Sequence, residues 1–289
     1  MDRQRSVCYE WGTGLGSENE ATGFKGEVEA GEMTTLSDYV NKYPEFAIER
    51  KDGVLHLRFH TDGKEWVWSS AGHRLVGDVL QNIDADRENR VLLLSGTGDN
   101  FLGSISLPSF KGITWDQMTW EAKRYINALL DLEIPVVAAV NGNCTIHAEI
   151  ALLSDIVLAS STAVFGDAAH FPRNVVPGDG TQIVWSTLLG PNRSRYILFA
   201  EKLLDAEEAL AAGIVGEVLD PAKLMDRAWE HAKRLAEKPA VVARNTRTAL
   251  LRPIKKAFED SLALGLALQG AAYGNHPHRG EVPVERDQT

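Results

Sequence analysis

The sequence predicts an α/β protein built on a largely parallel sheet. Through the middle of the chain, apolar runs typical of buried strands alternate with segments of helical spacing. Each strand-like run is continuously apolar and is followed by a glycine or a polar turn. The chain of 289 residues, with 44% apolar and 24% charged residues, has the composition of a globular protein and the length of one large domain.

The expected elements follow one another along the chain from a hairpin onward. Two β-rich runs flank Asp52 and Gly53, a dipeptide typical of hairpin turns. Buried strands are expected where the sequence is continuously apolar, at 90–98, 134–142 and 155–161. Helices are expected where apolar residues recur every three or four positions, at 70–86, 115–133, 147–155, 205–215, 224–238 and 240–269.

This pattern divides the chain into four segments. Residues 1–35 and 273–289 are polar and lack periodicity, so we expect a flexible N-terminal extension and a flexible tail. Residues 36–204 contain the strand and helix alternation and form the expected core. Beyond residue 205 we expect no strand, and residues 205–272 are predicted to be a helical C-terminal region.

Composition excludes several classes of function. The formal charge of −10 and the pI of about 5.3 argue against a nucleic-acid-binding surface. No apolar run is long enough to span a membrane, and the N-terminus lacks the apolar core of a signal peptide. The two cysteines, Cys8 and Cys144, do not make a disulfide framework, so we expect a protein of the reducing cytoplasm.

Six segments occur in an order that resembles the crotonase (enoyl-CoA hydratase/isomerase) superfamily, over residues 45–260. They are IPVVAAVNG, LLSDIVLAS, AVFGDAAHF, VVPGDGTQ, LLGPNRSRYILF and DAEEALAAGIVGEV. The resemblance implies a spiral of β-β-α units with a helical C-terminal region that serves trimer assembly. It therefore implies a homotrimer or a dimer of trimers.

Several residues depart from the hydratase pattern of that superfamily. Hydratases of the family use two glutamates; Glu149 matches the first, whereas His170 stands at the position of the second. His147 occupies a position where the family has glycine. The first oxyanion segment reads FLGSISL, in which Gly103 and Ser104 are small enough for the backbone to approach a substrate.

These departures look like the 6-oxocamphor hydrolase type of β-diketone hydrolase. The segments that carry this likeness are KEWVWSS, IHAEI, HFPRNVVPGDG and GLALQG. Such enzymes add water to a diketone and break the carbon–carbon bond between its two carbonyls in a retro-Claisen reaction, without CoA or metal. The resemblance places functional residues at Trp68, His147, His170 and Asp179. Its glutamate falls at Gln269, so this position is not retained.

The residue types alone suit the same chemistry. A histidine with a carboxylate on its far nitrogen is a general base for water near neutral pH, and His170 with Asp179 has this composition. Trp68 and His147 offer N–H donors for a substrate carbonyl or an enolate. No G-x-S-x-G segment supplies an activated serine, and because an enolate leaves readily, no cofactor is expected.

Simpler interpretations compete for each of these residues. Trp68 can be a packing residue, His147 a core histidine, Asp179 a turn former and Glu149 a helix residue without a role. A zinc site from His147, His170 and Asp179 has suitable ligand types, but their spacing resembles no metal motif. In the tail, His276 and His278 are expected to be exposed.

Three functions remain after this comparison. The first is a cofactor-independent hydrolase of a small-molecule, cyclic or branched β-diketone. The second is a CoA-thioester hydratase or isomerase with Glu149 as its acid/base residue. The third is a catalytically silent family member whose helical region serves assembly. The residue at position 170 separates the first two, because the hydratase reaction needs a pair of carboxylates.

Overall fold

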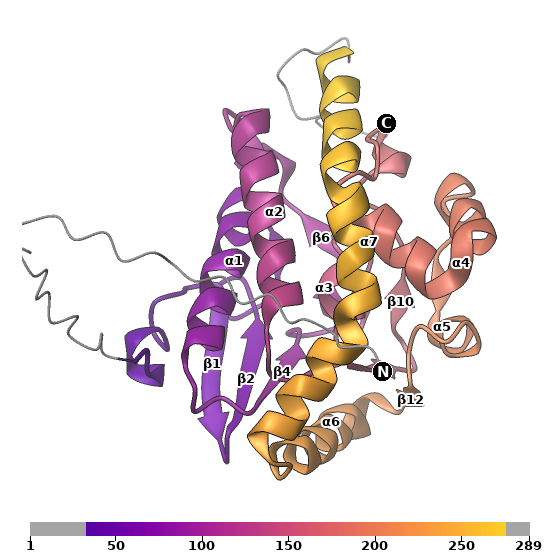
Figure 1. Ribbon diagram of the computed structural model, residues 1–289. Coiled ribbons are helices and arrows are strands. Elements are labelled where there is room, and N and C mark those ends of the chain that lie inside the picture. Colours follow the sequence, from indigo (N-terminus) through magenta and orange to yellow (C-terminus); the bar gives the residue numbers. More distant parts are fainter. Residues whose placement is uncertain (1–32, 276–289) are drawn as a thin grey trace, which may run out of the picture. The chain divides into compact units, whose positions relative to one another are not determined.

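The computed structural model describes residues 33–275 (Figure 1). Most of the predicted N-terminal extension and most of the tail lie outside the described residues, as do Cys8, His276 and His278.

The main sheet has six strands in the order β1-β2-β4-β7-β9-β12. Their bounds are β1 (Phe46–Lys51), β2 (Val54–Phe59), β4 (Val91–Ser95), β7 (Val136–Val140), β9 (Ile156–Ser160) and β12 (Glu217–Leu219). Only β1 and β2 pair antiparallel; the other neighbours are parallel. The predicted hairpin is confirmed, because Asp52 and Gly53 connect these two strands with φ values of 52° and 77°.

A second sheet is formed by short strands, most of which directly follow a strand of the main sheet in the sequence. It has the order β11-β10-β8-β5, and a further pair is formed by β3 and β6. The bounds are β3 (Val67–Trp68), β5 (Asn100–Leu102), β6 (Ser104–Ile105), β8 (Asn143–Cys144), β10 (Val164–Phe165) and β11 (Leu204–Asp205). Four times, a strand of the main sheet is followed by one or two short strands and then an α-helix. This repeat is the β-β-α spiral that the resemblance implied.

Seven α-helices and three short 3-10 helices complete the described part of the chain. They are η1 (Leu36–Asp38), α1 (Ser70–Ala85), η2 (Leu107–Phe110), α2 (Trp115–Asp131), α3 (Glu149–Leu152), η3 (Phe171–Arg173), α4 (Thr181–Phe199), α5 (Ala206–Ala211), α6 (Pro221–Ala236) and α7 (Ala240–Asn275). Among the described residues, no helix is both long and apolar enough to cross a bilayer.

The main sheet is buried on both faces, which explains its continuously apolar strands. In β4, Leu92 and Leu94 belong to the larger hydrophobic core, whereas Val91 and Leu93 belong to a smaller core that includes Leu224 of α6. Successive side chains of a strand point to opposite faces, so both sets must be apolar. Helices α1 and α2 pack together on the larger core (Figure 1).

Two expectations about the C-terminal half need correction. The prediction that no strand follows residue 205 is wrong, because β12 adds a sixth strand parallel to β9. Its three residues are only half-buried and carry no apolar run, so their place in the sheet depends on pairing with β9 and not on local pattern. The segment 147–155 was expected to be helical, but its helix α3 has only four residues.

Candidate active site

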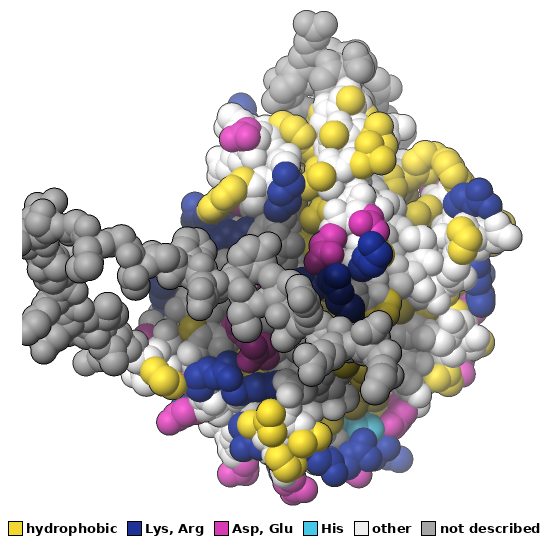
Figure 2. Space-filling view, viewed as in Figure 1, with side chains coloured by type: hydrophobic (Ala, Val, Ile, Leu, Met, Phe, Trp, Pro, Cys, Tyr) yellow, Lys and Arg dark blue, Asp and Glu magenta, His cyan; other side chains and the backbone are white. Residues whose placement is uncertain are grey.

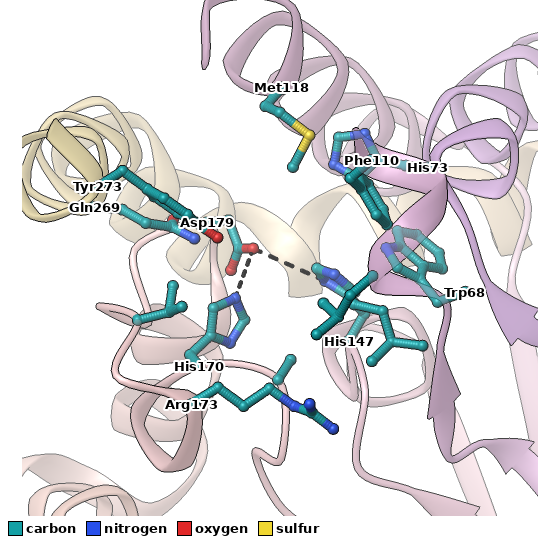
Figure 3. Close-up of a pocket in the computed structure, with 14 residues that line it drawn as sticks. Trp68, His73, Phe110, Met118, His147, His170, Arg173, Asp179, Gln269 and Tyr273 are labelled. Carbon is teal, nitrogen blue, oxygen red and sulfur yellow. Dashed lines mark hydrogen bonds and ion pairs between the residues drawn. The ribbon is translucent and has the colours of Figure 1, made fainter. Parts of the chain in front are cut away.

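A cavity opens between β3, the loop that precedes α4, and helices α1, α2 and α7 (Figure 3). Four of the predicted residues line it together with Gln269, although the chain brings them from widely separated segments. They are Trp68, His147, His170 and Asp179. Apolar side chains from η2 and α2, including Phe110 and Met118, also line the cavity.

His147 is fixed in the cavity wall by a buried carboxylate. Its Nδ1 atom lies 2.7 Å from Glu149 Oε1 and 4.0 Å from Asp179 Oδ2. Glu149 also accepts hydrogen bonds from Tyr125 Oη at 3.0 Å and from Thr181 Oγ1 at 3.2 Å. Since Nδ1–H donates to Glu149, Nε2 is the unprotonated nitrogen of the neutral ring. No described side chain is hydrogen-bonded to Nε2.

The backbone of His147 explains why a family glycine position accepts this residue. Its φ is 48°, in the left-handed region that glycine adopts freely. Histidine is one of the few other residues found there with some frequency. The strained backbone turns the side chain toward Glu149, two residues later, and against the Trp68 ring at a centroid distance of 4.3 Å.

His170 has a carboxylate on each of its ring nitrogens. The predicted contact with Asp179 is present, with 2.9 Å between His170 Nε2 and Asp179 Oδ2. The other nitrogen, Nδ1, lies 2.8 Å from Asp167 Oδ1, an interaction that the sequence analysis did not identify. All three side chains are buried.

The electrostatics of this cluster follow from burial and charge together. Burial alone would lower the pKa of His170, but the charges of Asp179 and Asp167 outweigh it and hold that pKa well above 6.5. Burial alone would raise the pKa of Asp179, yet His170 beside it lowers that pKa below its ordinary value. For His147, burial is likewise outweighed by Glu149 and Asp179, so its pKa is raised.

A third histidine lines the cavity, and it was not predicted from the sequence as a site residue. His73 of α1 is buried, lines the cavity and holds Glu121 of α2 at 2.8 Å through Nδ1. Burial lowers the pKa of this histidine, despite the carboxylate. The available signal was its position on the apolar face of α1, in register with Val76, Val79 and Leu80.

Two predicted substrate-binding residues do not line the cavity. At Gly103 a Cβ atom would lie 2.5 Å from Asn100 Oδ1 and 2.8 Å from Asn143 Cβ, so this glycine serves close packing. Ser104 is exposed, and from this segment Ile105 and Leu107 line the cavity instead. Contact of Gly103 and Ser104 with a substrate stays a prediction.

Gln269 of α7 does line the cavity, as the sequence indicated. Its side chain is buried, and among the described residues its Oε1 atom has no hydrogen-bond partner. Asp179 Oδ1 is likewise a buried acceptor without a partner. Figure 3 shows both side chains on the same side of the cavity. The packing of Gly178 against Gln269 Cβ brings them together.

One group of side chains in the cavity has the composition of a metal site. Ligand atoms of His147, Glu149 and Asp179 lie within 4.8 Å of one another. His147 Nδ1 is already hydrogen-bonded to Glu149, and Asp179 Oδ2 to His170, so a metal ion would have to break both contacts. The geometry therefore suits proton transfer between paired groups better than metal binding.

Comparison with known proteins agrees with this fold. Residues 50–280 match the sequence model of the enoyl-CoA hydratase/isomerase family. A short-chain-enoyl-CoA hydratase of Clostridium acetobutylicum is 29% identical over 209 residues, which cover 68% of this chain and 75% of the relative. An enoyl-CoA hydratase/isomerase structure from Mycobacterium paratuberculosis has a TM-score of 0.75 at 20% identity, covering 82% of this chain and 96% of that one.

A further solved structure is more similar in sequence. It is a β-diketone hydrolase from the cyanobacterium Anabaena sp., bound to (S)-3-oxocyclohexyl acetic acid. Its identity to this chain is 41% with a TM-score of 0.80, and the match covers 81% of this chain and 96% of that one. With the family match over residues 50–280 and the β-β-α spiral, the chain belongs to the enoyl-CoA hydratase/isomerase family of the crotonase superfamily.

Proposed function

We propose that this protein is a hydrolase that cleaves a carbon–carbon bond of a β-diketone by adding water, without CoA or a metal. The observation that carries the proposal is the content of the cavity. It holds imidazoles paired with buried carboxylates, and a histidine occupies the position of the second hydratase glutamate. Imidazole paired with a buried carboxylate suits activation of water.

His147 is the base in this proposal, in place of His170. Both nitrogens of His170 face carboxylates, so neither can take a proton from water. His147 has the geometry that a base requires, because Glu149 holds Nδ1 and leaves Nε2 as the acceptor. Glu149 then stabilises the imidazolium that forms, as the aspartate of a hydrolase triad does.

The reaction balances with one water molecule and no other reactant. Water adds to one carbonyl carbon and gives its proton to His147 Nε2, while Asp179 Oδ1 accepts a hydrogen bond from its second O–H. The tetrahedral intermediate breaks the bond to the carbon between the two carbonyls. The electron pair of that bond forms the enolate of the second carbonyl, which Trp68 Nε1–H stabilises, and His147 returns the proton to carbon. The products are a carboxylic acid and a ketone, which stay joined as one keto acid when the diketone is cyclic.

The arrangement of Glu149 speaks against the hydratase alternative. Its Oε1 atom accepts from Tyr125 and His147, and its Oε2 atom accepts from Thr181. A hydratase glutamate must exchange a proton with the substrate or with water. Here the Glu149 carboxylate is occupied by its neighbours, and neither Glu149 nor any other glutamate of the described residues lines the cavity.

The Anabaena hydrolase supports the choice of substrate class. Its ligand is a keto acid with a ring ketone, which is the type of product that water-driven cleavage of one ring of a bicyclic β-diketone gives. We therefore extend the proposal to a cyclic β-diketone for this chain.

Assembly into a trimer or a dimer of trimers, in the cytoplasm, completes the proposal. It is supported by apolar side chains on the surface of the C-terminal region. Leu264 and Leu268 of α7 are 63% and 53% exposed and lie one helical turn apart. Figure 2 shows hydrophobic side chains gathered over the half of α7 that lies away from α6. Such a patch is typical of an interface between copies of a chain.

The discriminating experiment compares two kinds of substrate on the full-length protein. A panel of cyclic β-diketones is assayed by loss of diketone absorbance, and crotonyl-CoA is assayed by hydration. We expect diketone turnover that survives chelation by EDTA and is lost in His147→Ala. Hydration of crotonyl-CoA with no diketone turnover would establish the hydratase alternative. Inactivity on both, with His147→Ala indistinguishable from the parent, would favour a catalytically silent protein.

A further inference from the structure

We infer that His170 is a fixed imidazolium clamped between Asp167 and Asp179, and that Asp167 is the positioning residue that holds this charge in place. The role of the charge in catalysis rests on the proposed function, whereas its existence does not. Asp167 is not one of the residues that line the cavity, so it acts through His170.

The contacts of the ring require two N–H donors. Both carboxylates approach within hydrogen-bond distance, at 2.8 Å on Nδ1 and 2.9 Å on Nε2, and an ionised carboxylate can only accept. A neutral ring would turn the lone pair of one nitrogen toward a carboxylate oxygen in a buried site. That repulsion is removed if the ring carries both protons.

Asp167 is itself held as an acceptor by the backbone. Its Oδ1 atom accepts from the N–H groups of Ala169 and His170, at 3.1 and 3.2 Å, in addition to His170 Nδ1. The loop between β10 and η3 therefore folds around this oxygen. Three donors converge on it, which fits an ionised carboxylate and fixes the plane of the imidazole ring.

The surroundings contain more negative than positive charge. Asp167 and Asp179 flank the ring, and the third buried carboxylate, Glu149, lies beyond His147, whose ring is 5.8 Å from that of His170. Arg173 of η3 and Tyr273 of α7 also line the cavity near this cluster. A fixed positive charge on His170, between two of these carboxylates, lowers the cost of burying them. The raised pKa of His170 agrees with this arrangement.

His170 and His147 therefore have different roles in the reaction. Because His170 keeps its protons, it holds Asp179 ionised and binds Asp179 Oδ2, while Asp179 Oδ1 stays without a partner among the described residues. The proton released by water must then go to His147. His170 supplies charge and position, and His147 exchanges the proton.

The charge itself is tested by NMR of ¹⁵N-histidine-labelled protein, which reports the protonation of each ring nitrogen. In the parent protein we expect His170 to keep both protons well above pH 6.5. In Asp167→Asn the amide Oδ1 can still accept the two backbone bonds, but one negative charge is lost, so His170 should titrate at lower pH. Glu217→Gln is the matched control, since it removes a carboxylate 2.8 Å from His231 outside the cavity and should leave His170 unchanged. A neutral His170 ring in the parent at pH 7 would overturn the inference.

The pH profile of diketone turnover tests the role of that charge. If His170 must stay protonated, kcat of the Asp167→Asn variant should fall at alkaline pH. The fall should occur at the pH where NMR shows His170 losing its proton. If His170 were the base, the same variant would gain activity at lower pH, because the base would become available sooner. These shifts have opposite directions. Should the protein turn over no diketone, the NMR result would still decide the charge, so failure of the proposed function and failure of the clamp remain distinguishable.

Discussion

The Nδ1 atom of His147 lies 2.7 Å from the Oε1 atom of Glu149, so this carboxylate determines which ring nitrogen carries the proton. Glu149→Gln keeps the shape of the side chain but lets an amide N–H face the ring, which favours the opposite tautomer. We expect kcat for diketone cleavage to fall by as much as ~10⁴-fold, the size of a comparable change in a hydrolase triad.

The control for this variant is the same Glu→Gln substitution at a glutamate that contacts a histidine outside the cavity. Glu49 lies 3.0 Å from His56 Nδ1, so Glu49→Gln should leave kcat unchanged. Circular dichroism verifies that both variants are folded. A Glu149→Gln enzyme with the parent's kcat would show that Glu149 does not set the tautomer of a catalytic base.

The pH dependence of kcat/KM should report His147. Burial lowers its pKa, but Glu149 and Asp179 outweigh burial, so the net pKa lies above 6.5. Since the protonated ring cannot act as a base, kcat/KM should fall as pH decreases, with a midpoint above 6.5. Removing one of the two negative charges in Asp179→Asn should move that midpoint to lower pH. A profile without an acid limb above pH 5 in the parent would contradict His147 as the base.

The indole of Trp68 is expected to act through its N–H group. Trp68→Phe keeps an aromatic ring against His147 but removes the donor, and loss of one preorganised donor typically lowers the rate by ~10²–10³-fold. Trp66→Phe is the matched control, because the Trp66 N–H binds Glu45 at 2.9 Å and this residue does not line the cavity. If both variants lose stability and neither loses kcat, Trp68 is a packing residue.

The amide at Gln269 keeps a further negative charge out of the cluster. Gln269→Glu would add a carboxyl beside Asp179, where burial and like charge raise its pKa. The folded state then binds a proton that the unfolded chain has lost, so the free energy of unfolding should decrease as pH rises above ~4.3. Thermal denaturation at pH 5 and pH 8 measures this. Gln269→Met, which adds no charge, should show no such pH dependence; equal slopes in the two variants would refute the charge argument.

Assembly is expected to depend on the exposed face of α7. Charged residues at Leu264 and Leu268, in the variant Leu264→Glu/Leu268→Glu, should shift the protein from trimer to monomer in light scattering at micromolar concentration. Val241→Lys at the other end of α7 is matched in exposure, since Val241 and Leu264 are both 63% exposed. A parent protein that is monomeric at this concentration would contradict the assembly outright.

Much of the fold could be predicted because local sequence patterns indicate its turns and buried strands. The hairpin at Asp52 and Gly53 depends on a dipeptide that adopts positive φ, and the buried strands depend on uninterrupted apolar runs. Strand β12 escaped prediction because three half-buried residues carry no such signal. Its pairing with β9 is decided by where the chain returns after α5.

The site divides in the same way. The resemblance of the sequence to the β-diketone hydrolases placed functional residues at Trp68, His147, His170, Asp179 and Gln269, and all five line one cavity. Which nitrogen faces which carboxylate depends on the packing of distant segments. His73 meets Glu121 across 48 residues, and Asp167 takes the nitrogen of His170 that a base would need. Motifs along the sequence identify the residue types of the site, but ring orientation and burial, which set their protonation, arise only when distant segments pack.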